Sequence, residues 1–136
     1  MKVNDYEIKP GANLTRADLE DASLEGANLA GAMLYFTSLL RANLAGTNLQ
    51  GTCLHYAFLH YANLQGSNLT GANLTRADLQ GADLTDAKLW NADLTDANLA
   101  GTNLQAAILS PDMIWKFSKE LSEAKNLDKV VLKVQQ

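Results

Sequence analysis

Leucine stands at every fifth position from Leu14 to Leu109, twenty times without an exception. An α-helix turns by about 100° per residue, so five residues would rotate successive leucines by roughly 140°. A strand alternates its faces, so successive leucines would point to opposite sides. All twenty leucines can be buried only if the chain bends by about a quarter turn every five residues. The pattern therefore predicts an all-β solenoid in which twenty residues make one coil.

The other positions of the five-residue unit support this prediction. The residue two places before each leucine is always Ala, Thr or Ser, and we expect it to point inward where four walls converge. The residue directly before each leucine is Asn or Asp in thirteen of the twenty units, and we expect it to point outward and to bond nearby backbone groups. Residues 12–111 then form about five coils, with Leu54, Leu59, Ala57 and Ala62 fully buried at the centre.

All nine glycines fall in one phase of the unit, which we assign to the corners. A corner that needs a positive φ explains this, so Gly46, Gly51 and Gly66 are predicted to have φ above zero. One corner has no glycine, and we predict a turn without positive φ there, such as type I. That corner carries Arg16, Phe36, Tyr56, Arg76 and Asp96.

The two ends are predicted to differ from the repeats. Residues 1–11 offer only a small N-terminal plug, so that end is the more favourable one for self-association as a weak homodimer, if the chain is not a monomer. Residues 112–136 are predicted to form a C-terminal α-helical cap, with a first helix near 111–124 that starts at Ser110 and Pro111. A second helix is predicted after Asn126, although its valines also fit a strand. Docking of this tail on a partner or a membrane surface is the alternative.

Charge and composition limit the function classes. The net charge of the chain is −4. Residues 12–111 alone carry −5, which argues against direct binding to nucleic acid. No apolar run approaches the length of a membrane span. The single Cys53 excludes an internal disulfide, and no secretion signal precedes the repeats, so we expect a cytoplasmic protein that does not enter the membrane.

Aromatic and apolar residues gather in the second and third predicted coils, at positions that should face solvent. We call these eight residues the aromatic patch: Tyr35, Phe36, Leu40, His55, Tyr56, Phe58, His60 and Tyr61. One interpretation is that the N-terminal segment covers the patch, or that its side chains stack along the corner. The other is an interface for another protein or a second copy, since such surfaces are uncommon on monomers.

Cys53, His55 and His60 lie close together in this scheme and raise the question of a metal site. Zinc needs three or four converging ligands, whereas these side chains radiate from a convex surface and no Asp or Glu lies in the same two coils. A cysteine–histidine nucleophile also lacks a pocket and a third group to orient the base. We therefore predict no metal, no cofactor and no enzymatic activity.

The tandem [Ala/Ser/Thr]-[Asn/Asp]-Leu-x-x pattern resembles the pentapeptide repeat family over about three quarters of the chain. The resemblance implies a right-handed quadrilateral β-helix, and it is strongest to the Leu-centred, Ala-rich members abundant in cyanobacteria. It favours a protein-interaction or scaffold module with an unknown partner. The family also includes quinolone-resistance proteins that mimic DNA and bind gyrase, which makes a DNA mimic the alternative. The acidic residues that would serve it are Asp78, Asp83, Asp86, Asp93 and Asp96.

Overall fold

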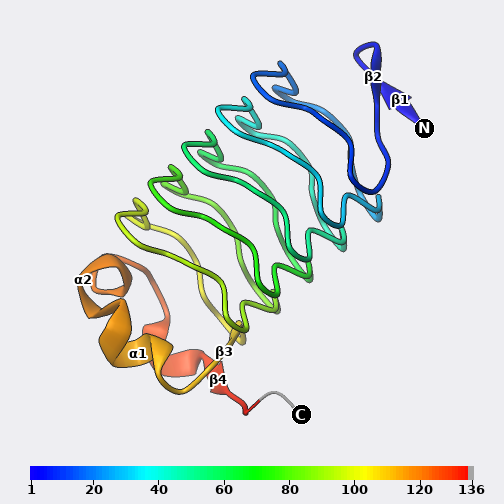
Figure 1. Cartoon of the computed structure of the whole chain (residues 1–136). Coiled ribbons are helices and arrows are strands. Elements are labelled where there is room, and N and C mark those ends of the chain that lie inside the picture. Colours follow the sequence, from blue (N-terminus) through cyan, green and yellow to red (C-terminus); the bar gives the residue numbers. More distant parts are fainter. Residues whose placement is uncertain (135–136) are drawn as a thin grey trace.

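Successive coils are joined by backbone hydrogen bonds that repeat every twenty residues. In the computed structural model, which describes residues 1–134, Asn13 forms a parallel bridge with Met33, and the same offset continues to Lys88 and Ile108. Leucine N–H groups donate along the axis to the next coil, as Leu54 N does to the Asn73 carbonyl at 2.8 Å. The walls are therefore ladders of single β-bridges, and the coils stack into a rod (Figure 1).

The interior of the rod is a column of leucine and small residues. Leu54, Leu59 and Ala57 are 0% exposed and Ala62 is 1% exposed, which confirms the predicted core. Threonine can replace alanine in this column because its hydroxyl finds a backbone acceptor. Thr37 Oγ1, for example, donates to the Leu14 carbonyl at 2.6 Å.

Every corner uses the same backbone conformation. The small residue closes the turn, as where Ala57 N donates to the Leu54 carbonyl at 2.9 Å. The residue before it has a positive φ, including Gly51 at 66°, which confirms the glycine prediction together with Gly46 at 64° and Gly66 at 67°. Positive φ at this third residue is the signature of a type II turn.

The prediction for the corner without glycine is wrong. Phe36, Tyr56 and Arg76 have φ values of 56°, 60° and 59°, so this corner uses the same turn as the others. The reason is that the middle peptide of each corner also bonds the next coil, as Tyr56 N does to the Thr75 carbonyl at 3.1 Å and Gly51 N to the Thr70 carbonyl at 2.9 Å, so all corners must turn that peptide the same way. A left-handed residue other than glycine costs roughly 1–2 kcal/mol. At this corner, contacts between neighbouring side chains offset part of that cost, as described below.

A short hairpin covers the N-terminal end of the rod (Figure 1). Strands β1 (Lys2–Val3) and β2 (Tyr6–Glu7) pair antiparallel around Asn4 and Asp5, whose positive φ values of 50° and 68° form the tight turn typical of two-residue hairpin loops. The Tyr6 hydroxyl accepts a hydrogen bond from Asp18 N at 3.4 Å. Ile8 is 5% exposed and joins the core.

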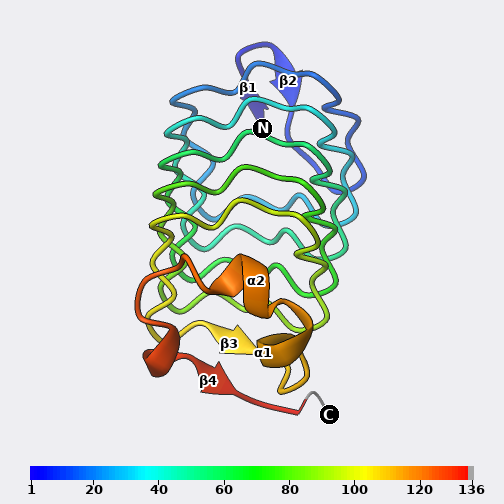
Figure 2. The same cartoon turned by 90° about the vertical axis from the view of Figure 1, so that its left-hand side faces the viewer.

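The C-terminal end is covered by helices and one added strand (Figure 2). Helices α1 (Met113–Lys116) and α2 (Ser118–Leu121) lie within the first predicted helical range and bury Met113, Phe117 and Leu121. None of the helices in residues 1–134 has the length and hydropathy needed to cross a bilayer.

The second predicted helix is wrong. The chain forms a 3-10 turn, η1 (Leu127–Lys129), and then strand β4 (Val131–Leu132), which pairs in parallel with β3 (Ile108–Leu109). The free edge of β3 supplies backbone partners, and β-branched valines suit an extended chain better than a helix. Residues 135 and 136 of the predicted cap lie outside the described range.

Candidate functional site

The outward side chains form columns, because residues twenty apart lie on neighbouring coils. We number the walls by their first bridge residues, Asn13, Asp18, Ser23 and Asn28, and each wall continues at every twentieth residue. Two corners enclose the second wall, which is the wall of interest. The second wall carries Asp18, Ser38, Phe58, Asp78 and Asn98 before its leucines, and Glu20, Leu40, His60, Gln80 and Ala100 after them. The first corner precedes it, with Arg16, Phe36, Tyr56, Arg76 and Asp96. The second corner follows it, with Asp21, Arg41, Tyr61, Gly81 and Gly101.

The structure divides the aromatic patch into two groups. Tyr35, Phe36, His55 and Tyr56 contact one another on the first wall and first corner. In this group the His55 ring meets the edge of Tyr56 with ring centres 4.5 Å apart. A hydrogen bond with Cys53 raises the pKa of Tyr35. The second group lies across the second wall and consists of Leu40, Phe58, His60 and Tyr61.

The first corner is a continuous stack along the rod. The Arg16 guanidinium lies 4.7 Å from the centre of the Phe36 ring, which stacks on Tyr56 with centres 5.0 Å apart and planes 6° apart. The Arg76 guanidinium covers the other face of Tyr56 at 5.6 Å and lies 3.7 Å from Asp96. Both faces of each ring are therefore occupied, which agrees with the interpretation that these side chains stack along the corner.

The second group forms an apolar hollow of about 470 Å³, lined by Ser38, Leu40, Phe58, His60 and Tyr61. Phe58 is 45% exposed and Tyr61 is 59% exposed, so both rings are open to solvent. The Phe58 and His60 rings are parallel, with planes 5° apart and centres 6.2 Å apart. His60 Nε2 lies 2.7 Å from Asp78 Oδ2, which fixes the imidazole at the side of the hollow.

The hollow exists because two side chains of the second corner turn away from each other. Arg41 reaches back to the preceding coil, where Nε donates to Asp21 Oδ1 at 2.8 Å and a terminal nitrogen donates to Glu20 at 2.7 Å. Tyr61 reaches forward and lies against Gly81, where any Cβ would overlap its ring. The hydrogen bond from Arg41 lowers the pKa of the Asp21 carboxyl.

The hollow also interrupts a polar row. Elsewhere the outward Asn and Asp side chains accept from the backbone N–H two residues later, as Asp18 does from Glu20 at 3.1 Å and Asp78 does from Gln80 at 3.0 Å. Between these two positions the second wall carries Ser38 and Phe58 instead. The N-terminal hairpin contacts Asp18 at the first coil and leaves Phe58 and Tyr61 uncovered.

The five aspartates considered for DNA mimicry are spread around the rod. Asp78 lies on the second wall beside His60, and Asp96 lies on the first corner beside Arg76. Asp93 lies on the first wall, where a hydrogen bond from Thr95 lowers its pKa. Asp83 and Asp86 lie on the third wall and its following corner, so the five carboxylates do not form one strip.

Cys53, His55 and His60 are likewise divided between walls. Cys53 and His55 belong to the first wall, whereas His60 is on the second wall. Within residues 1–134, no cluster of three His, Cys, Asp or Glu side chains could hold a metal ion.

Sequence reasoning missed three residues that shape the hollow. Ser38 lines it, Asp78 orients His60, and Gly81 makes room for Tyr61. The contact between Tyr61 and Gly81 had a signal in the sequence: a large corner residue is followed twenty positions later by a glycine.

Comparison with known proteins supports the fold. A family profile described as pentapeptide repeats (8 copies) matches residues 12–51, 52–91 and 72–110. A comparison with curated proteins finds no significant match. A pentapeptide repeat protein from the thylakoid lumen of Arabidopsis thaliana superposes with a TM-score of 0.78 at 22% identity, covering 86% of this chain and 81% of that chain. One from Nostoc PCC 7120 has a TM-score of 0.57 at 32% identity, covering 88% of this chain and 86% of that chain.

A third pentapeptide repeat protein, from the cyanobacterium Cyanothece 51142, has a TM-score of 0.48 at 28% identity, covering 96% of this chain and 69% of that chain. The family match and the first two structures show a right-handed quadrilateral β-helix. The cytoplasmic location expected from the sequence stays a prediction.

Proposed function

Because the chain belongs to the pentapeptide repeat family, whose rod displays side chains in ordered columns, we propose that it is a non-enzymatic protein-interaction module. The single observation that carries the proposal is the apolar hollow on the second wall. Its rings are exposed, and its volume of about 470 Å³ is within the usual range of ligand pockets, about 300–1,000 Å³.

The surroundings of the hollow suggest the chemistry of the partner. Asp18, Glu20, Asp21 and Asp78 lie along the second wall and second corner, where Arg41 is the one basic side chain and is already paired with Glu20 and Asp21. An apolar centre with acidic ends favours a protein that presents an aromatic or aliphatic side chain between lysines or arginines. We therefore propose such a basic, apolar surface as the occupant.

The first corner is a less favourable binding surface, although it also holds aromatic residues. Its rings are already covered by Arg16 and Arg76, and a partner would have to displace these cations before it could reach them. We therefore propose that the interface comprises four of the eight residues of the aromatic patch: Leu40, Phe58, His60 and Tyr61.

The proposal can be tested with matched variants of the two surfaces. Phe58→Ala combined with Tyr61→Ala removes the hollow, whereas Phe36→Ala removes a ring of similar size from the first corner. We expect the first variant to weaken capture of its specific partners from extracts of the source organism by about tenfold or more, because truncated interface aromatics commonly cost over 1.4 kcal/mol. Phe36→Ala should capture them like the wild type. Equal capture by all three proteins would contradict the proposal.

DNA mimicry is less well supported than a protein interface at the hollow. Mimicry needs negative charge in a continuous strip, and the five aspartates are scattered around the rod. A gyrase supercoiling assay separates the two ideas. We expect no inhibition at low micromolar protein, and inhibition that persists in the Phe58→Ala variant would favour mimicry.

A further inference from the structure

The C-terminal edge of the last coil, residues 92–110, is extended by the chain's own tail on two walls. On the third wall, Lys125 N donates to the Thr102 carbonyl at 2.8 Å, and the Lys125 carbonyl accepts from Leu104 N at 3.0 Å. On the fourth wall, β4 adds to β3, with Val131 N donating to the Ala107 carbonyl at 2.8 Å. The tail therefore imitates part of another coil.

The second wall is not extended in this way. Between the preceding coil and the last one, Asn98 makes both ladder bonds on this wall: its N–H donates to the Ala77 carbonyl at 2.9 Å, and its carbonyl accepts from Leu79 N at 2.8 Å. On the last coil the corresponding groups are the Ala97 carbonyl and the Leu99 N–H. Within residues 1–134 neither group has a hydrogen-bond partner.

The helices explain why this position is open. The residue twenty places after Asn98 is Ser118, and it begins α2 instead of continuing the ladder. The tail rejoins the ladder only at Lys125, which pairs with Asn103. The corners on both sides are nevertheless satisfied, because Asp96 N donates to Glu120 Oε2 at 2.8 Å and Gly101 N donates to the Glu123 carbonyl at 3.1 Å.

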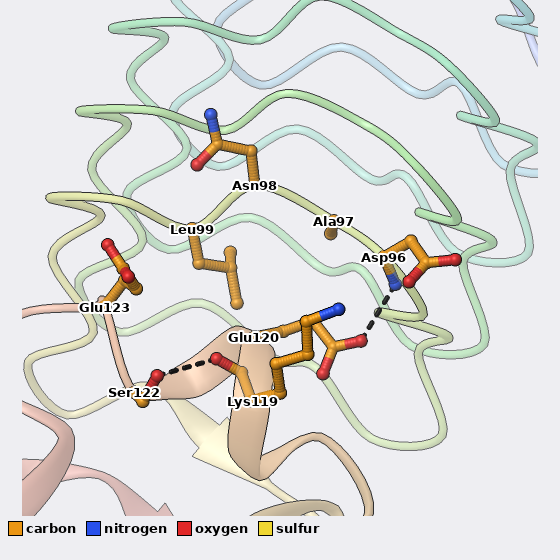
Figure 3. A pocket seen from close by; sticks show the side chains of 8 residues that line it. All are labelled: Asp96, Ala97, Asn98, Leu99, Lys119, Glu120, Ser122 and Glu123. Carbon is orange, nitrogen blue, oxygen red and sulfur yellow. Dashed lines mark hydrogen bonds between the residues drawn. The ribbon is translucent and has the colours of Figure 1, made fainter.

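A pocket lies in front of the open edge, between the last coil and α2 (Figure 3). Its volume is about 270 Å³, below the usual range of small-molecule sites, which is about 300–1,000 Å³. We call it the edge notch. The edge notch is lined by Asp96, Ala97, Asn98, Leu99, Lys119, Glu120, Ser122 and Glu123.

We propose that the edge notch binds an extended segment of another protein by β-augmentation. One residue of that segment would occupy the register above Asn98, with its N–H donating to the Ala97 carbonyl and its carbonyl accepting from Leu99 N. Lys125 makes the same pair of bonds on the adjacent wall, so the fold itself shows the geometry of the occupant. This residue cannot be proline, because it must supply an N–H.

The charges at the notch favour a basic segment. Asp96, Glu120 and Glu123 line it against the single cation of Lys119. The side chain of the added residue would project outward beside Asn98, as outward residues do along each ladder. A lysine or arginine at this position would therefore be preferred over a glutamate.

The test uses the full ¹⁵N-labelled chain and three capped pentapeptides. The probe is Ac-Val-Thr-Lys-Thr-Val-NH₂, the first control carries an N-methyl group on the lysine amide nitrogen, and the second replaces the lysine by glutamate. We expect the probe to shift the Leu99 amide resonance and to slow its hydrogen exchange, while Leu104 N, which is already bonded, stays unchanged. The N-methyl peptide should bind about three- to tenfold more weakly, since it loses one hydrogen bond.

Three outcomes would overturn this inference. The Leu99 amide could fail to respond to the probe, or the N-methyl peptide could act as well as the probe. A Leu99 shift that depends on protein concentration and not on peptide would identify a second copy as the occupant and would also overturn it. The Phe58→Ala variant should respond to the probe like the wild type, so failure at the notch and failure of the hollow are distinguishable.

Discussion

The first and second corners have the same backbone and opposite surfaces. At both, a residue with φ near 60° closes a turn over buried leucines, as Tyr56 at 60° and Tyr61 at 57° do. Tyr56 is enclosed by Phe36 and Arg76, whereas Tyr61 lies on Gly81 and leaves its other side to the hollow. The difference teaches that one backbone conformation can carry both a covered ring and a ring that is open to solvent. The backbone is uniform, and the neighbour one coil away decides whether a ring stabilises the rod or is available to a partner.

The largest expected effect is on the interior that both corners share. Leu54 precedes the first corner and Leu59 precedes the second, and both are 0% exposed. Either Leu→Ala change should lower the free energy of unfolding by about 2–5 kcal/mol, because rigid neighbouring coils cannot close the cavity. Urea denaturation of the two variants measures this. A loss below about 1 kcal/mol at either position would contradict an inward leucine there.

A smaller loss is expected from a β-branched residue at either kind of corner. Gly51→Val and Tyr56→Val both place valine at φ near 60°, which a β-branched side chain resists. Gly51→Val should lower the free energy of unfolding by about 1–2 kcal/mol, whereas Tyr56→Val should lose less through the backbone, because Tyr56 already bears the cost of the left-handed conformation. Gly51→Ala and Tyr56→Ala are the matched controls without branching. If Tyr56→Val proved as stable as Tyr56→Ala, the left-handed conformation at the first corner would not be required.

A pair of glycine variants distinguishes the effect of displacing the Tyr61 ring from the effect of backbone strain at a corner. Gly81 and Gly71 both have φ of 68°, but only a Cβ at Gly81 would overlap the Tyr61 ring, since nothing lies within 4 Å of a Cβ at Gly71. Both Gly→Ala changes should lose about 1 kcal/mol through the backbone. Gly81→Ala should also displace the ring, which shifts the Tyr61 ring resonances in NMR spectra, and it should weaken partner capture. Identical behaviour of the two variants would remove Gly81 from the description of the site.

The smallest effect should appear on acidification. Arg41 holds the pKa of Asp21 below its ordinary value of 3.8, so the folded state favours the ionised carboxylate. The stabilisation is present above the unfolded pKa and is lost as the pH falls through the folded one. Melting temperatures of the wild type and Asp21→Asn should therefore converge below pH 3.8. Because both groups are exposed, the difference at neutral pH should be slight and should shrink in high salt.

The repeats were predictable from the sequence because their determinants are local. The five-residue period places every leucine inward, and the glycine phase marks the corners, so Leu54 and Gly51 needed no knowledge of distant residues. The first corner was mispredicted because an absent glycine was interpreted as an absent positive φ. The corner phase contains no valine, isoleucine or threonine from Arg16 to Ala106, and this was the usable signal.

The candidate site and the tail depend on contacts that local patterns do not contain. Tyr56 and Tyr61 occupy equivalent positions in the sequence, and the residues one coil away on each side distinguish them: Phe36 and Arg76 for Tyr56, Arg41 and Gly81 for Tyr61. The tail was mispredicted for a similar reason. Val131 fits a helix pattern in isolation, but the unpaired edge of β3 lies close enough to make it a strand.

The twenty-residue offset of the ladder makes a single coil an interchangeable unit of length. Duplicating residues 52–71 would lengthen the rod by about 4.8 Å and leave every leucine in a familiar environment. It would also repeat Phe58, His60 and Tyr61 one layer further along. In the first copy Tyr61 would meet another tyrosine instead of Gly81, so tandem duplication changes the length of the rod without any redesign of the interior but does not by itself copy the hollow.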